Sequence, residues 1–184
     1  IDRYSPEIDE AALRVAAHLP GAYGSEWRTD LVARNLGAAT ATLKFVLHQY
    51  NGNLEGTGTI SGRAQKAFED IVLSLGGAAS KGSLEICSDQ PLLIAGRTFS
   101  VSTLGTFGQN FEGHVAALGY VAGDTISLIG LRQQEGAFRS NLSVTNGGTT
   151  DAEVGVILYD AAGTQLKTYN LTIPKGQVIQ DIEP

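Results

Sequence analysis

Apolar and polar residues alternate along several stretches of the chain. In the ranges 40–50 and 152–159, apolar side chains stand at every second position. Because successive side chains of a β-strand point to opposite faces, this period of two predicts strands that bury one face. The alternating apolar residues are Leu43, Phe45 and Leu47 in the first range and Val154, Val156 and Leu158 in the second.

Turn-forming residues separate the predicted strands at short intervals. Asn51-Gly52-Asn53 and Asp160-Ala161-Ala162-Gly163 each follow an alternating stretch, and Asn and Gly tolerate the backbone angles of tight turns. Short strands joined by such turns, without regular alternation of strand and helix, predict an all-β antiparallel sandwich. The further predicted strands are 29–34, 58–62, 83–88, 92–101, 125–131, 141–145 and 165–173, and short helices are predicted after Pro6 and at 67–75.

The sequence contains an internal repeat. Residues 27–71, which begin WRTDLVARNLGAATATLKFVL, align without a gap on residues 138–182, which begin FRSNLSVTNGGTTDAEVGVIL. About ten positions are identical, where unrelated segments of this length would share about three. The identical pairs include Arg28/Arg139, Leu31/Leu142, Asn35/Asn146, Gly37/Gly148, Gly52/Gly163, Thr57/Thr168, Asp70/Asp181 and Ile71/Ile182. We therefore predict two tandem β-sandwich units.

The repeat sets the predicted domain boundaries. The first unit continues, after the repeated segment, into the strands 83–88 and 92–101, whereas the second reaches Pro184 without counterparts of them. We therefore expect the second sandwich to be incomplete at its C-terminus, with a sheet edge open to pairing. The predicted parts are a lead-in at 1–14, the first sandwich at 15–102, a glycine-rich connector at 103–123 and the second sandwich at 124–184.

Composition narrows the class of protein. The net charge is -6 and the 13 Lys and Arg residues are scattered, which argues against a nucleic-acid surface. No apolar run approaches the roughly 20 residues of a membrane-spanning helix. The chain begins at Ile1 and contains no Met, which indicates a trimmed product and is compatible with secretion. Few Lys, one Cys and many Gly, Thr and Ser residues are typical of a bacterial secreted protein.

The sequence carries no catalytic or metal-binding signature. The histidines His18, His48 and His114 have no second ligand at metal spacing, and we expect them at the surface. The single cysteine, Cys87, is expected to be a buried small apolar residue. Nucleophile-elbow, phosphate-loop and paired-carboxylate patterns are absent from the sequence. We therefore predict no catalytic residue, cofactor or metal, with Asp151, Glu153 and Asp160 as the weaker alternative of a calcium site.

The repeated polar residues are interpreted first as structural. Arg28 is expected to bond Asp30 or a loop carbonyl, and Asn35 and Asn146 to form turns. Asp70 and Asp181 are expected to cap a turn or short helix. The remaining candidates, which form the predicted interaction surface, are Tyr23, Trp27, Phe107, Gln109 and Phe111.

These patterns resemble the immunoglobulin-like β-sandwich repeats of bacterial secreted and cell-surface proteins, many of unknown function. The resemblance rests on the repeated segments and on SDQPLLIAGRTFSV and GTFGQNF, and it covers most of residues 15–184. It implies a non-catalytic spacer, adhesive module or appendage to other domains, outside the cell. The incomplete second unit adds the prediction that the module assembles with other protein chains by strand addition.

Two alternatives stay open. The first is a carbohydrate-binding accessory module, whose sugar platform would use aromatic side chains from Tyr23, Trp27, Tyr50, Phe107 and Tyr120. The second is a secreted protease inhibitor that presents the connector 103–114 as an exposed loop, or an enzyme assembled from distant residues. Nucleic acid and a membrane span are not expected.

Overall fold

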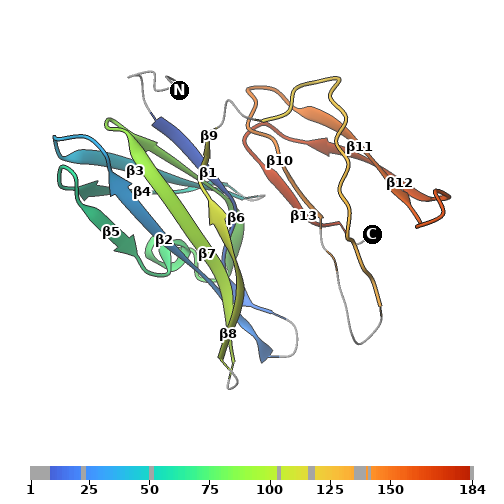
Figure 1. The fold of residues 1–184 in the computed structure, drawn as a ribbon, viewed down its shortest axis with the longest axis horizontal. Helices are drawn as coiled ribbons and strands as arrows, with labels where there is room; N and C mark the ends of the chain where they lie inside the picture. Colours follow the sequence, from blue (N-terminus) through green and yellow to red (C-terminus); the bar gives the residue numbers. More distant parts are fainter. Residues whose placement is uncertain are drawn as a thin grey trace. The chain divides into compact units, whose positions relative to one another are not determined.

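The computed structural model describes residues 9–21, 24–49, 52–102, 105–115, 119–134, 140 and 142–182. The chain divides into two compact units, Ile1–Leu118 and Gly119–Pro184, which we call unit 1 and unit 2. The regular secondary structure of the described residues is almost entirely β-strand, with one short helix, so the predicted all-β class is confirmed (Figure 1). Among them, no helix has the length and apolar character needed to cross a membrane.

Unit 1 is a β-sandwich. Ten elements follow one another along the chain, and one of them is a single helical turn. They are β1 (Asp9–Pro20), β2 (Glu26–Asn35), β3 (Ala41–His48), β4 (Leu54–Ile60), β5 (Gln65–Phe68), α1 (Ile71–Ser74), β6 (Ser80–Ser88), β7 (Leu92–Ser102), β8 (Gly105–Glu112) and β9 (His114–Val115).

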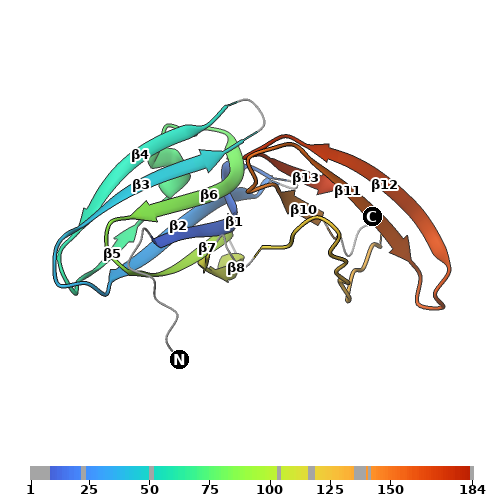
Figure 2. The same cartoon turned by 90° about the horizontal axis from the view of Figure 1, so that it is seen from above.

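Strand pairing divides unit 1 into two layers, which Figures 1 and 2 show from two sides. One layer has the order β4-β3-β6-β1, and the other contains β2 with β5 beside it, followed by β7 and β8. The strand β1 joins both layers, because residues 9–18 pair with β6 while Leu19 and Pro20 pair with β2. A β-bulge between Leu13 and Ala16 marks the place where β1 turns from one layer toward the other.

The core of unit 1 lies between the two layers. Alternate residues of β2, β3 and β6 face inward, so the period of two seen in the sequence is the period of burial. Phe45 is central, 1% exposed, with its ring edge-on to Phe68 at a centroid distance of 5.1 Å. The other buried members are Leu13, Ala16, Leu31, Ala33, Ala41, Leu43, Leu47, Ile60, Ile71, Val72, Leu84, Ile86 and Ile94.

Unit 1 is longer at both ends than the predicted sandwich 15–102. The lead-in 1–14 was predicted to be separate, but β1 begins at Asp9 and pairs with β6, so no helix extends through Leu13. The predicted connector 103–123 also contains two strands, since β8 pairs with β7 along its whole length and β9 pairs with β1. Sheet pairing and the packing of Phe111 against the core outweigh the glycine content of this segment.

The described residues of unit 2 form two strand pairs. The strand β10 (Leu142–Thr145) pairs with β13 (Val178–Ile182), and β11 (Ala152–Tyr159) pairs with β12 (Gln165–Ile173). These partnerships repeat those of β2 with β5 and of β3 with β4. Of the described apolar residues in unit 2, Ile173 and Val178 are the buried ones, so its core is much smaller than that of unit 1.

The strand register of unit 2 differs from the ungapped alignment. Ala41 lies opposite Ile60, and its counterpart Ala152 lies opposite Ile173, two residues beyond the position that the alignment predicts. A β-bulge between Leu158 and Tyr159 accompanies the two extra residues of this hairpin. Positions beyond the hairpin turn therefore do not correspond in space as aligned, which applies to Thr57/Thr168, Asp70/Asp181 and Ile71/Ile182.

The predicted strand 125–131 does not form. This segment precedes β10 as β1 precedes β2, but it has no ladder partner among the described residues. Its large apolar side chains are exposed, with Ile129 at 95%. An apolar pattern is insufficient for a strand when no neighbouring strand satisfies its backbone hydrogen bonds. The exposed residues of this segment are Ile126, Leu128, Ile129 and Leu131, and Tyr120 and Val121 before it are exposed as well.

Candidate interaction surfaces

The register of unit 1 brings two of the predicted surface residues together. Trp27 on β2 lies opposite Ser100 on β7, which in turn lies opposite Phe107 on β8. Directly opposed residues share a face of the sheet, so a small buried serine stands between two aromatic side chains. Trp27 is partly buried and Phe107 is 59% exposed. We call Trp27, Ser100 and Phe107 the aromatic row. These residues are on the face of the sheet that points toward the core, at the end of that face where the side chains become exposed to solvent.

The other predicted surface residues lie in different settings. Gln109 is exposed and occupies the next inward-facing row, opposite Thr98. Phe111 is only partly buried but packs against the core cluster, so it anchors β8 to unit 1. Tyr23 lies outside the described residues. Among those residues β8 pairs with β7 alone, which leaves one of its edges open beside the aromatic row.

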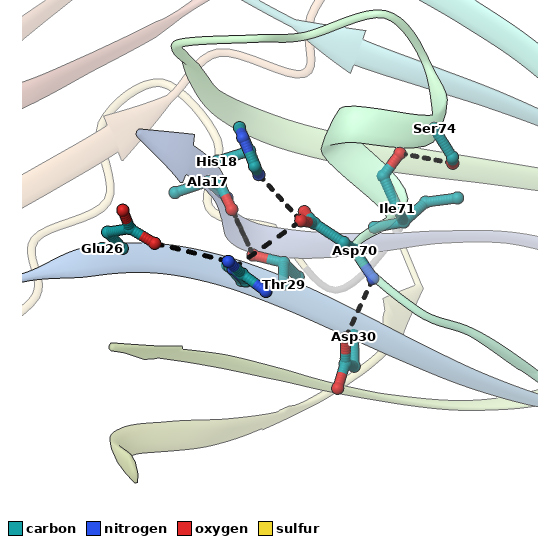
Figure 3. Close-up of polar contacts among 9 residues, drawn as sticks. Ala17, His18, Glu26, Thr29, Asp30, Asp70, Ile71 and Ser74 are labelled. Carbon is teal, nitrogen blue, oxygen red and sulfur yellow. Dashed lines mark hydrogen bonds and ion pairs between the residues drawn. The ribbon is translucent and has the colours of Figure 1, made fainter. Parts of the chain in front are cut away.

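A charged cluster joins β1, β2 and the turn before α1 (Figure 3). His18 Nδ1 lies 2.8 Å from Asp70 Oδ2, and Arg28 Nε lies 4.0 Å from the same oxygen. The Arg28 guanidinium also contacts Glu26 at 3.3 Å, so its partners are Glu26 and Asp70 and the predicted bond to Asp30 is replaced. Asp30 instead accepts a hydrogen bond from the Asp70 backbone N–H at 2.9 Å.

The backbone at Asp70 is strained. Its φ of 44° and ψ of 57° lie in the left-handed region, which is costly for a residue with a side chain. Asp70 precedes α1 as predicted, but its side chain does not cap the helix and pairs with His18. The contacts of Asp70 with His18, Arg28 and Asp30 hold three segments of unit 1 together.

A second cluster lies on the outer face of the β3–β6 pair. His48 Nε2 lies 2.6 Å from Glu85 Oε2, and Cys87 Sγ donates to Glu85 Oε1 at 3.2 Å. His48 is largely buried rather than a free surface residue, and Cys87 is half-buried and bonded to a carboxylate rather than part of the apolar core. Burial raises the pKa of Glu85, but the hydrogen bonds from His48 and Cys87 and the charges of His48 and Lys44 together lower it below 4.5.

The lowered pKa of Glu85 makes the stability of unit 1 sensitive to acid. Because the carboxylate is favoured in the folded state, its contribution is complete above the ordinary pKa of 4.5 and is lost as the pH falls through the lowered value. We expect Glu85→Gln to flatten the fall in unfolding free energy between about pH 5 and pH 3, measured by urea unfolding. Glu55→Gln, at an exposed glutamate, should keep the wild-type slope. Equal slopes in Glu85→Gln and wild type would contradict the prediction.

The carboxylates considered for calcium already accept hydrogen bonds from other groups of unit 2. Asp160 accepts hydrogen bonds from the backbone N–H groups of Thr164 and Ala162, and these bonds lower its pKa. Asp151 accepts from the Lys175 N–H, and Glu153 from the Thr172 hydroxyl. Across the described part of the chain, no three His, Cys, Asp or Glu side chains are grouped closely enough to hold a metal ion.

An asparagine in each unit makes the same set of contacts. Asn35 is fully buried; its amide donates to Ala39 O and Ile60 O, and its Oδ1 accepts from the Gly37 N–H. The amide of Asn146 donates to Thr150 O and Ile173 O, and its Oδ1 accepts from the Gly148 N–H. Each asparagine therefore forms the predicted turn and also fixes it to a return strand about 25 residues later.

The largest difference between the units is at β11. In unit 1, β3 lies between β4 and β6, and its inward side chains are fully buried. In unit 2, β11 pairs with β12 alone among the described strands. Its inward side chains are only half-buried, and no Lys or Pro protects the strand. These inward side chains are Ala152, Val154, Val156 and Leu158.

Comparisons with known proteins give no family for this chain. No family model matches the sequence, and no curated protein matches it. A solved structure titled "Crystal Structure of Thermotoga maritima 1070" is similar with a TM-score of 0.48 and 13% sequence identity. The match covers 58% of this chain and 93% of that chain.

Proposed function

We propose that the chain is a non-catalytic structural or adhesive module that joins other protein chains, copies of itself included, by strand addition. In this proposal the units are tandem immunoglobulin-like sandwiches, the second incomplete, and the protein works outside a bacterial cell. The observation that carries it is the open edge of β11 with its half-buried inward side chains. A sheet edge with exposed apolar residues on both sides is a template for pairing with another strand.

Other surfaces of the molecule support the same proposal. The edge of β8 is open among the described residues, and Ile157 and Tyr159 on the outward face of β11 are more than a third exposed. The exposed apolar residues of 119–134 form a further apolar area of unit 2. Large exposed apolar areas on a protein mark sites of interaction with other proteins. The two charged clusters join separate strands of unit 1, which is a structural role.

Association in solution tests this proposal. We expect sedimentation velocity to show concentration-dependent species larger than the 19.3 kDa chain. Val156→Lys should weaken this association at least about tenfold, because an ammonium group would have to be buried on the inward side of the joined sheet. Thr168→Lys, on the exposed outward face of β12, adds the same charge and should associate as wild type. A chain that stays monomeric at every concentration would contradict self-assembly.

The aromatic row favours carbohydrate binding as a second candidate. Trp27 and Phe107 flank Ser100 at one end of the sheet, which is the kind of paired aromatic surface on which sugar rings stack. A glycan array probed with the whole protein separates this candidate from strand addition. The inhibitor alternative rested on a loop at 103–114, and residues 105–112 of that segment are a strand paired with β7.

A further inference from the structure

The free edge of β11 can be compared residue by residue with its covered counterpart in unit 1. Along β3, Leu43 lies opposite Ser88, Phe45 opposite Ile86, and Leu47 opposite Leu84. Leu84 and Ile86 are both fully buried in the core. Thus β6 supplies a second row of hydrogen bonds to β3 and also two apolar side chains that cover the row of Phe45.

Strand β11 has the position of β3 but not its neighbour. Both strands follow an asparagine-anchored turn, and both pair with the next strand through the same residues, Ala41 with Ile60 and Ala152 with Ile173. In the alignment of residues 27–71 with residues 138–182, Val154, Val156 and Leu158 correspond to Leu43, Phe45 and Leu47. The described residues of unit 2 contain no strand in the place of β6.

We infer that β11 is an acceptor for one antiparallel β-strand that lies outside the described residues of unit 2 and whose side chains follow the pattern of β6. The inference rests on the proposed function and names its site. The incoming strand places two large aliphatic side chains, spaced two residues apart, against Val156 and Leu158. The polar residue between them faces outward beside Ile157, and the residue that follows the pair faces outward beside Gly155.

Main-chain pairing makes a polypeptide, rather than a glycan or a lipid, the fitting occupant. An eight-residue strand offers a row of N–H and C=O groups at its edge, which another strand satisfies in full. Glu153 is the one charged residue of β11, so little on this strand repels an apolar partner. Gly155 has no outward side chain, and a Cβ placed there would lie more than 4 Å from other atoms, so this position leaves room for a partner strand.

The register gives a direct test by disulfide trapping. In unit 1, Lys44 lies opposite Cys87, and the residue of β11 at the Lys44 position is Gly155. A synthetic peptide of residues 80–88, SKGSLEICS, carries that cysteine and serves as the probe. The full chain is used in a Cys87→Ser background with Gly155→Cys, and mixed-disulfide formation is measured in a glutathione redox buffer. Two matched variants, Glu153→Cys and Ile157→Cys, place the thiol on the same exposed face two residues away.

We expect the peptide to be trapped at position 155 at least about tenfold more than at 153 or 157, because opposed side chains are close enough for a disulfide and diagonal ones are not. A peptide with Leu84→Lys and Ile86→Lys should lose this preference. Equal trapping at the three positions, or equal trapping of both peptides, would overturn the inference. Failed trapping in a chain that self-associates in sedimentation velocity would overturn the inference about β11 and leave strand addition at another edge. A chain that stays monomeric but traps the peptide at position 155 would support the acceptor role of β11 and refute self-assembly.

Discussion

Replacing Phe45 with alanine is expected to lower the unfolding free energy of unit 1 by about 3–5 kcal/mol. The ring is 1% exposed, lies edge-on to Phe68, and sits against Gly58, where an added Cβ would lie only 3.1 Å from it. Removing it loses the transfer free energy of the ring and leaves a cavity between two layers that other strands hold apart. A loss of this size is a large part of the roughly 5–15 kcal/mol of a typical domain.

Trp27 makes this measurement specific to unit 1. It is the single tryptophan of the chain, so its fluorescence in urea reports the unfolding of that unit. Lys44→Ala is the matched control, because Lys44 is the adjacent residue on β3, points outward, and makes an exposed ion pair with Glu55 at 3.0 Å. Such pairs contribute about 0–1 kcal/mol. Similar losses for Phe45→Ala and Lys44→Ala would show that the layers do not pack around Phe45 as described.

The sequence predicts those parts of the fold that repeat at short range. Alternation identifies β3 and β11, the Asn and Gly residues identify their turns, and the absence of strand–helix alternation identifies the all-β class. The prediction fails where a strand depends on distant partners. The segment DEAAL within β1 contains good helix-forming residues, yet it is a strand because β6 lies beside it. Conversely, 125–131 is rich in apolar residues and forms no strand, because no strand among the described residues lies beside it.

The candidate surfaces show the same limit. Trp27 and Phe107 could be selected from the sequence as aromatic residues near turns, but their alignment across Ser100 follows from the register of three strands. The pairs His18–Asp70 and His48–Glu85 join residues 52 and 37 positions apart, and nothing local in the sequence connects them. The two-residue shift in the register of β11 and β12 likewise depends on a β-bulge, and no turn residue in the sequence indicates that bulge. Whether the predicted interaction surface binds a partner stays a prediction.

Replacing Asn35 with alanine is expected to destabilise unit 1 by about 2–4 kcal/mol. The side chain is fully buried, and its loss removes its hydrogen bonds to the buried Ile60 carbonyl and to the half-buried Gly37 N–H. An unsatisfied buried polar group costs about 1–3 kcal/mol, more than a hydrogen bond contributes when it is formed. The turn 36–40 and the end of β4 would then lose the side chain that fixes them to each other.

Two further variants separate the hydrogen bonds of Asn35 from its size. Asn35→Asp keeps the shape and the acceptor for Gly37, but at neutral pH it turns a carboxylate oxygen toward the carbonyls of Ala39 and Ile60. We expect it to be at least as destabilising as alanine at pH 7 and to recover part of the loss in acid, where a protonated carboxyl can donate. Asn146→Ala removes the same three contacts from unit 2, so the Trp27 transition should stay within about 0.5 kcal/mol of wild type. A wild-type urea midpoint for Asn35→Ala, with an unchanged denaturant slope, would refute the role assigned to this asparagine.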